Sequence, residues 1–134
     1  KLGERLITVD CDVLVADGGT RTTSISGGYI ALAIAINKLL KDGVIETNPV
    51  VHQVAALSVG INSDGDVIAD LNYEEDSSCH TDMNVVMTQS GDFVEVQGTA
   101  EGKPFTPTQL ENLLTCSKTA MEPIFKAQNE IINQ

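Results

Sequence analysis

Residues Ser24 to Lys41 form a segment that is apolar on almost every side, and it limits the possible folds more than any other part of the chain. Its apolar residues recur at helical spacing, and most of the positions between them are apolar as well. The stripe consists of Ile25, Tyr29, Leu32, Ile36, Leu39 and Leu40. We therefore expect a helix that is buried on more than one side. Gly27 and Gly28 predict close packing along this helix, and Gly43 predicts its end.

Strand patterns lie on both sides of this helix. Residues 6 to 15 alternate between apolar and polar side chains, which predicts a half-buried strand. Residues 50 to 61 form a nearly continuous apolar run, which predicts a central strand covered on both faces. The dipeptide Asp64-Gly65 predicts a hairpin turn after that strand. Residues 81 to 88 and 92 to 98 predict a second hairpin.

The last helix has the clearest boundary in the sequence. Thr106 suits the N-cap, Pro107 the first helical position and Gln109 the third, which together form a capping box. An amphipathic stripe follows, and Pro123 within it predicts a kink unless the lost hydrogen bond goes to water. The order strand, helix, four strands, helix predicts an α+β fold, a mixed α/β sandwich with both helices against one sheet. We expect residues 1–134 to form one domain.

Charge and length restrict the function. Eight Lys and Arg residues against nineteen Asp and Glu residues give a net charge of −11. This charge argues against a free-standing nucleic-acid binder, because phosphate backbones are bound through positive charge. The chain begins at Lys1 rather than at methionine, so we expect it to be a piece of a longer protein.

Cysteine usage and hydropathy predict the compartment. The chain has three cysteines, Cys11, Cys79 and Cys116, with no Cys-x-x-Cys pair, so neither a disulfide framework nor a zinc site is indicated. Cys79 and Cys116 are most simply small buried side chains. No apolar run is expected to span a bilayer, and no signal peptide is evident. We expect a cytoplasmic protein with no membrane partner.

An acidic stretch from Asp70 to Asn84 lies between two apolar runs that resemble strands. Asp76 and Asp82, six residues apart across a predicted loop, suit a divalent metal or an acid and base beside a phosphate. Spacing alone slightly favours a simpler interpretation, which is a solvated acidic loop. His80 lies in the same loop, where a single histidine is more often merely exposed.

The turn Gly18-Gly19-Thr20-Arg21-Thr22 lies between the first predicted strand and the first helix. Backbone N–H groups, a hydroxyl and a guanidinium can converge there on an anion, of which orthophosphate is the simplest. The turn is neither a Walker loop nor a dinucleotide fingerprint. As a bare motif it is better explained as a helix-capping turn with a surface arginine.

Six motifs taken together resemble bacterial ribonuclease PH, in order and from end to end of the chain. They are Leu2-Gly3-Glu4-Arg5, Asp10-Cys11-Asp12-Val13, Ala16-Asp17-Gly18-Gly19-Thr20-Arg21-Thr22, Tyr73-Glu74-Glu75-Asp76-Ser77, Asp82-Met83-Asn84-Val85-Val86-Met87-Thr88 and Glu95-Val96-Gln97-Gly98-Thr99-Ala100-Glu101-Gly102. The resemblance implies a phosphate-dependent 3′→5′ exoribonuclease, a nucleotidyltransferase that trims tRNA 3′ ends and other RNA and releases nucleoside diphosphates.

The same resemblance implies roles for individual residues. Gly19, Thr20 and Arg21 would bind inorganic phosphate as co-substrate. Asp76 and Asp82 would be the catalytic acidic pair and would hold Mg²⁺. It also implies a ring of dimers, a homohexamer, built from strand-helix repeats.

This chain departs from the family pattern in three places and in length. Asn72 stands where an aspartate is common, and Cys79 and His80 replace residues that are usually small or acidic. Family members are about twice as long, so we expect the amino-terminal half, with its basic RNA-contacting residues, to be missing here. Two alternatives remain open. One is a catalytically silent ring subunit or fragment, and the other is a non-enzymatic anion-binding module.

Overall fold

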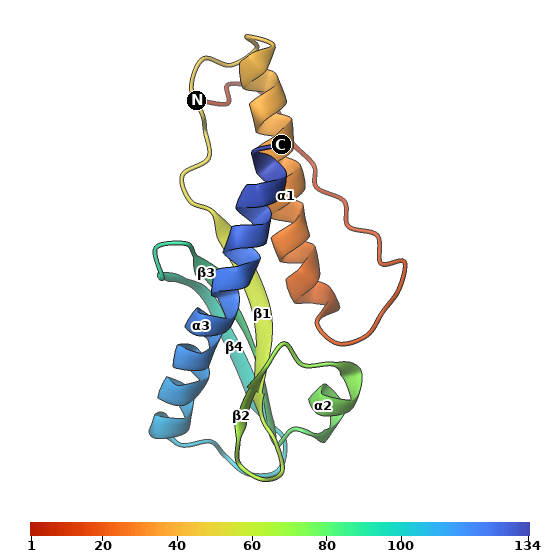
Figure 1. Cartoon of the computed structure of the whole chain (residues 1–134), viewed down its shortest axis with the longest axis vertical. Coiled ribbons are helices and arrows are strands. Elements are labelled where there is room, and N and C mark those ends of the chain that lie inside the picture. Colours follow the sequence, from red (N-terminus) through yellow and green to blue (C-terminus); the bar gives the residue numbers. More distant parts are fainter.

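The computed structural model describes all residues from Lys1 to Gln134. A four-stranded antiparallel sheet, in the order β2-β1-β3-β4, packs with two long helices and one short helix (Figure 1). The elements are α1 (Thr20–Lys41), β1 (Val54–Ile61), β2 (Val67–Ala69), α2 (Tyr73–Ser78), β3 (Thr81–Thr88), β4 (Phe93–Ala100) and α3 (Pro107–Ile132). The mixed helix-and-sheet class and both predicted hairpins are confirmed. The first predicted strand is absent.

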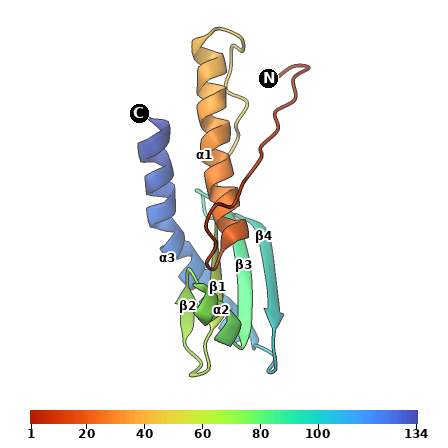
Figure 2. The same ribbon diagram turned by 90° about the vertical axis from the view of Figure 1, so that its right-hand side faces the viewer.

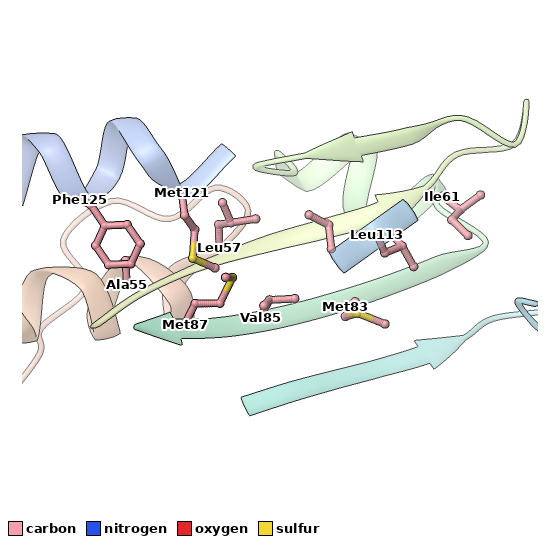
Figure 3. Close-up of a cluster of buried hydrophobic side chains, with 10 residues drawn as sticks. Ala55, Leu57, Ile61, Met83, Val85, Met87, Leu113, Met121 and Phe125 are labelled. Atoms are coloured by element: carbon pink, nitrogen blue, oxygen red, sulfur yellow. The ribbon is translucent and has the colours of Figure 1, made fainter. Parts of the chain in front are cut away.

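The hydrophobic core lies between α3 and one face of the sheet. Every second residue of β1 and β3 points toward α3, as the period of two in a strand requires (Figure 3). The cluster contains Ala55, Leu57, Val59, Ile61, Met83, Val85, Met87, Leu113, Met121 and Phe125. The predicted amphipathic face of the last helix is therefore confirmed, and it supplies one side of the core.

The helix α3 begins as the sequence predicts and continues past its proline. Thr106 accepts a hydrogen bond from the Gln109 N–H, and the Gln109 side chain accepts one from the Thr106 N–H. Pro123 lies inside the helix, which runs on to Ile132. Thr119, whose carbonyl would have bonded to an N–H at position 123, is exposed, so water can take the place of that donor.

The helix α1 packs along the outer edge of β1. The Ser26 hydroxyl donates to the Ala56 carbonyl and accepts from the Ala56 N–H, at 3.2 and 3.0 Å. Gln128 of α3, which is buried, donates to the carbonyls of Ser26 and Val54. Side chains of both helices thus satisfy backbone groups of β1 that would otherwise be unpaired in the interior.

The expectation that α1 is buried on more than one side is wrong. Only Thr22, Ala33 and Ile36 are buried in this helix, and Ile34 is 48% exposed. The reason is that β1 begins only at Val54, so much of α1 extends beyond the sheet beside the last turns of α3 (Figures 1 and 2).

By length and composition alone, α1 could cross a membrane, contrary to the expectation from the shorter apolar run. Core helices of soluble proteins also pass this test, and α1 contacts β1 and α3.

Residues 6 to 15 do not form the predicted strand. They make no backbone hydrogen bond and lie extended beside α1 (Figure 2). Leu14 and Val15 are 88% and 90% exposed, and Cys11 is exposed as well. A strand exists only with a partner, and no strand of this chain borders the segment.

The two glycines within α1 differ in how closely other parts of the chain approach them. A Cβ at Gly28 would lie 3.3 Å from the Val9 side chain of the extended segment, whereas one at Gly27 would meet nothing within 4 Å. Close packing is therefore confirmed for Gly28 only. The predicted helix stop is confirmed, because Gly43 follows the C-cap with a φ of 67°.

Candidate functional site

The candidate site lies on the sheet face opposite the core. Ser58 of β1 is paired with Asn84 of β3, and both alternate along their strands with residues that face α3. A depression of about 170 Å³ opens there. It is lined by Gly19, Thr20, Arg21, Ser58, Asp76, Asp82, Met83 and Asn84. All five residues that the sequence singled out therefore meet in one place, although they come from α1, α2 and β3.

The amino terminus of α1 forms one wall of this depression. Gly19 is the N-cap, with a φ of 70°, and no side chain caps the helix. The Thr22 hydroxyl donates to the Gly19 carbonyl, so it does not serve the free N–H groups of the first turn. No acidic residue lies in that turn. The open N–H groups and the helix dipole make this end of α1 suitable for an anion.

Asp17 and Gly18 connect the anion-binding turn to the acidic helix α2. The Asp17 carboxylate accepts a hydrogen bond of 2.8 Å from the N–H of Tyr73, the first residue of α2. A Cβ at Gly18 would overlap the carbonyl of Leu71, so the two backbones approach closely only because residue 18 has no side chain.

The acidic stretch is helical over Tyr73–Ser78, where a loop was predicted. Asn72 caps this helix by accepting from the Glu75 N–H, and the Glu75 side chain accepts from the Asn72 N–H. The capping box of α2 was visible in the sequence and was overlooked. It also explains the departure at position 72, because asparagine and aspartate cap helices equally well.

The carboxyl group of Asp82 is perturbed by its surroundings. Its pKa is raised above the ordinary value, first because the carboxyl is partly desolvated and second because Asp76 and Glu101 add negative charge nearby. Burial and the same acidic surroundings raise the pKa of the Cys79 thiol. Asp76 and Asp82 are thus close enough to repel each other, and this repulsion favours a proton or a cation between them.

The two carboxylates of the acidic pair suit Mg²⁺ better than a metal ion whose ligands all come from the protein. No group of three or more His, Cys, Asp or Glu side chains gathers anywhere in the chain. Mg²⁺ keeps several waters and is usually bound by one or two carboxylates together with substrate phosphates. Asp76 and Asp82 on the wall of an open depression fit that pattern.

Arg21 has a partner that the sequence interpretation missed. Its Nη1 and Nη2 atoms lie 2.9 Å from the two carboxylate oxygens of Glu95 on β4. Hydrogen bonding to Arg21 lowers the pKa of Glu95, and hydrogen bonding to Glu95 raises that of Arg21. Glu95 lies 74 residues away in the chain, and only the pairing of β4 with β3 brings it to the site.

Three further residues that line the depression were missed, namely Ser58, Met83 and Asn84, and His80, Cys79 and Cys116 lie outside it. The Ser58 hydroxyl donates to the Asn84 side-chain oxygen at 2.9 Å, which fixes both groups on the floor. His80 is exposed, as expected, and does not line the depression. Cys79 is buried, as expected, whereas Cys116 is only partly buried.

Comparison with known proteins identifies the class of protein first. Residues 52–120, which include β1 to β4 and the first half of α3, match the 3′ exoribonuclease family, domain 2. The chain belongs to this family.

The most informative relatives are both called ribonuclease PH. The chain is 50% identical over 134 residues to the protein of Bacillus velezensis, covering 100% of this chain and 55% of the relative. It is 52% identical over 132 residues to that of Bacillus subtilis, covering 98% and 54%. The chain therefore spans about half the length of the curated relatives it matches, and it corresponds to their carboxy-terminal part.

Solved structures agree in fold. Rice (Oryza sativa) Rrp46 superposes with a TM-score of 0.68 at 18% identity, covering 88% of this chain and 50% of that one. The Archaeoglobus fulgidus exosome, solved with RNA bound to the active site, gives a TM-score of 0.50 at 18% identity, covering 60% and 31%. At this level of identity the comparison shows the fold alone.

Proposed function

We propose that this chain carries the catalytic acidic pair and the phosphate site of a phosphate-dependent 3′→5′ exoribonuclease. The observation that carries the proposal is the single depression in which Gly19, Thr20 and Arg21 meet Asp76 and Asp82. The two aspartates share this depression with the uncapped amino terminus of α1. Membership of the 3′ exoribonuclease family supports the reaction class.

The two sides of the depression would have different tasks in this reaction. Arg21, Thr20 and the first N–H groups of α1 would hold inorganic phosphate. An oxygen of that phosphate forms a bond to the phosphorus of the 3′-terminal nucleotide while the bond from that phosphorus to the preceding 3′ oxygen breaks. The products are a nucleoside diphosphate and an RNA shortened by one nucleotide.

The leaving 3′ oxygen needs a proton, which either aspartate could supply. Asp76 and Asp82 would also hold Mg²⁺, which when bound offsets negative charge on the reacting phosphates. The acidic pair would otherwise repel both phosphate and RNA.

The RNA itself would be held mainly by other parts of the complete protein. A charge of −11 repels a phosphate backbone, so the basic surface has to come from outside this chain. We propose that tRNA 3′ ends are among the substrates and that the protein assembles as a ring of dimers in the cytoplasm. Membership of the 3′ exoribonuclease family supports an RNA substrate in general.

The test uses the full natural protein that contains this chain. A tRNA with extra 3′ nucleotides is incubated with and without inorganic phosphate, and the released nucleotides are separated. Nucleoside diphosphates that form only with phosphate are expected. Monophosphates would indicate a hydrolase, and no release would indicate a silent ring subunit or a non-enzymatic anion-binding module.

A second arm of the test uses residues 1–134 alone, once their folding is verified. We expect no trimming, because the substrate surface is missing, and self-association through exposed apolar side chains such as Leu14 and Val15. Phosphate-dependent trimming by a verified monomer would place the RNA-binding surface within this chain.

A further inference from the structure

The guanidinium of Arg21 is held from outside the anion-binding turn. Both of its terminal nitrogens face the Glu95 carboxylate at 2.9 Å, and Arg21 has no other side-chain or backbone acceptor. Glu95 is opposite Val86 in the β3–β4 pairing, next to a register shift between Val86 and Met87. A strand therefore fixes the backbone of Glu95, a helix fixes the backbone of Arg21, and the ion pair joins the two side chains.

This contact leaves Arg21 able to bind a second anion. A guanidinium carries five N–H groups, and a bidentate carboxylate on Nη1 and Nη2 occupies two of them. The Nε edge takes no part in this contact and remains free to bind an anion. Glu95 and a phosphate can therefore bind to the same side chain at the same time, on different edges.

The side chains around Arg21 explain why its contact with Glu95 matters. Asp76 and Asp82 line the same depression and offer two further carboxylates. Arg21 is long and half exposed, with a side-chain exposure of 51%, so without Glu95 it could turn toward either aspartate. If Arg21 formed an ion pair with one of these aspartates, its guanidinium would no longer be available to bind phosphate. That aspartate would also no longer be available to bind Mg²⁺.

We infer that Glu95 is a positioning residue that holds Arg21 beside the amino terminus of α1, so that phosphate meets a preoriented guanidinium and the two aspartates stay free. This inference rests on the proposed phosphate role of Arg21. In this inference Glu95 acts through Arg21 and does not contact the substrate.

The experiment measures the phosphate concentration for half-maximal rate and the maximal rate in the full natural protein. Glu95→Gln removes the charge and keeps the shape. It should raise the half-saturating phosphate concentration about two- to fivefold, the effect typical of an exposed ion pair, with little change in the rate at saturating phosphate. Glu95→Asp should give a smaller rise, and Glu111→Gln, the same change at an exposed position of α3, should give none.

A double-mutant cycle separates positioning from general stabilisation. In an Arg21→Ala background, Glu95→Gln should have no further effect on phosphate dependence, because its target is absent. An additive effect would overturn the inference. So would an unchanged or lowered half-saturating concentration in Glu95→Gln, since a lowered value would mean that Glu95 competes with phosphate.

Failure of this inference and failure of the proposed function give different results. If the unmodified protein shows no phosphate dependence, the proposed function falls and Glu95 has no phosphate-related role. If the unmodified protein requires phosphate and Glu95→Gln behaves like Glu111→Gln, only the role of Glu95 is refuted.

Discussion

On the α3 face of the sheet, β1 and β3 present Leu57, Val59, Met83 and Val85 to a helix that covers them completely. On the opposite face, the same two strands present Ser58, Asp82 and Asn84 to an open depression. Because side chains alternate, Ser58 and Asn84 each lie between two residues of the core. The core thus fixes the site, and changes on the two faces should have separable effects.

The largest effect is expected from the acidic pair. Asp76→Asn or Asp82→Asn should reduce turnover about 10²- to 10⁴-fold, because a group used in the transition state is lost. The fold and the RNA affinity should stay nearly intact, because neither side chain is buried. Turnover, circular dichroism and RNA binding of the full natural protein check this. Unmodified turnover in both variants would remove the pair from the mechanism.

Substitutions on the core face should lower stability and leave turnover nearly unchanged. Leu57→Ala should lower the free energy of unfolding by about 2–5 kcal/mol, because it leaves a cavity at a residue that is 1% exposed. Leu57→Met, which conserves volume, should cost less than about 1.5 kcal/mol. Denaturant unfolding measures both. Turnover per folded molecule should change little, and a loss as large as that of Asp82→Asn would show that the faces are not separable.

Substitution of Arg21 tests whether the site face of the sheet binds phosphate. Arg21→Ala removes a charge-assisted contact of about 1.5–3 kcal/mol, so the half-saturating phosphate concentration should rise about 10- to 150-fold. Arg21→Lys should restore only part of the affinity, because lysine lacks the planar fork and would bind Glu95 less well. Phosphate titrations of the rate check this. An unchanged phosphate dependence would place the phosphate site elsewhere.

Asp17 tests the connection between the turn and α2. Asp17→Ala removes the acceptor for the Tyr73 N–H, at a cost of about 1 kcal/mol to the start of α2. Amide hydrogen exchange at Tyr73 should become about fivefold faster. Asp17→Asn keeps an acceptor and serves as the control. Equal exchange in both variants would mean that the capping contact does not hold α2 in place.

The smallest effect concerns pH. The folded-state pKa of Asp82 is raised above its unfolded value, so the folded protein binds this proton more tightly. The stability from this group is therefore present below the unfolded pKa, near 3.9, and is lost as pH rises through the folded pKa. At neutral pH and without divalent metal, Asp82→Asn should raise the melting temperature by about 1–3 °C.

Asp64→Asn, an exposed turn position, is the control for the melting experiment. The difference between Asp82→Asn and the unmodified protein should shrink as pH falls below the unfolded pKa, because Asp82 is then protonated in both the folded and the unfolded protein. A constant difference across this range would mean that charge repulsion at Asp82 is not its cause.

Local signals in the sequence predicted local structure well. Thr106, Pro107 and Gln109 determined where α3 begins, because capping depends on neighbours within one turn. Asp64-Gly65 predicted the first hairpin for the same reason. The equivalent signal from Asn72 to Glu75 was present and would have predicted α2. The error there lay in treating an acidic segment as a loop.

Features that depend on distant partners were harder to predict. The alternation of apolar and polar residues from 6 to 15 is typical of a strand. A strand also needs a second strand to pair with, and this segment makes no backbone hydrogen bond. The site was predicted only through motif resemblance, which linked Arg21 to Asp82 across 61 positions. Glu95 was not recognised as a partner of Arg21, since that requires the register of β3 and β4, including its shift near Val86.

The contact of Ser26 with Ala56 determines where the sheet can grow. A further strand pairs only with N–H and carbonyl groups that are still free. At the start of β1, one hydroxyl already satisfies both groups of Ala56, and Gln128 satisfies the carbonyl of Val54. This border of the sheet is therefore closed to strand addition by side chains rather than by a loop. The eight residues of β4 remain as the long open border, so extension of the sheet by backbone pairing has a preferred direction.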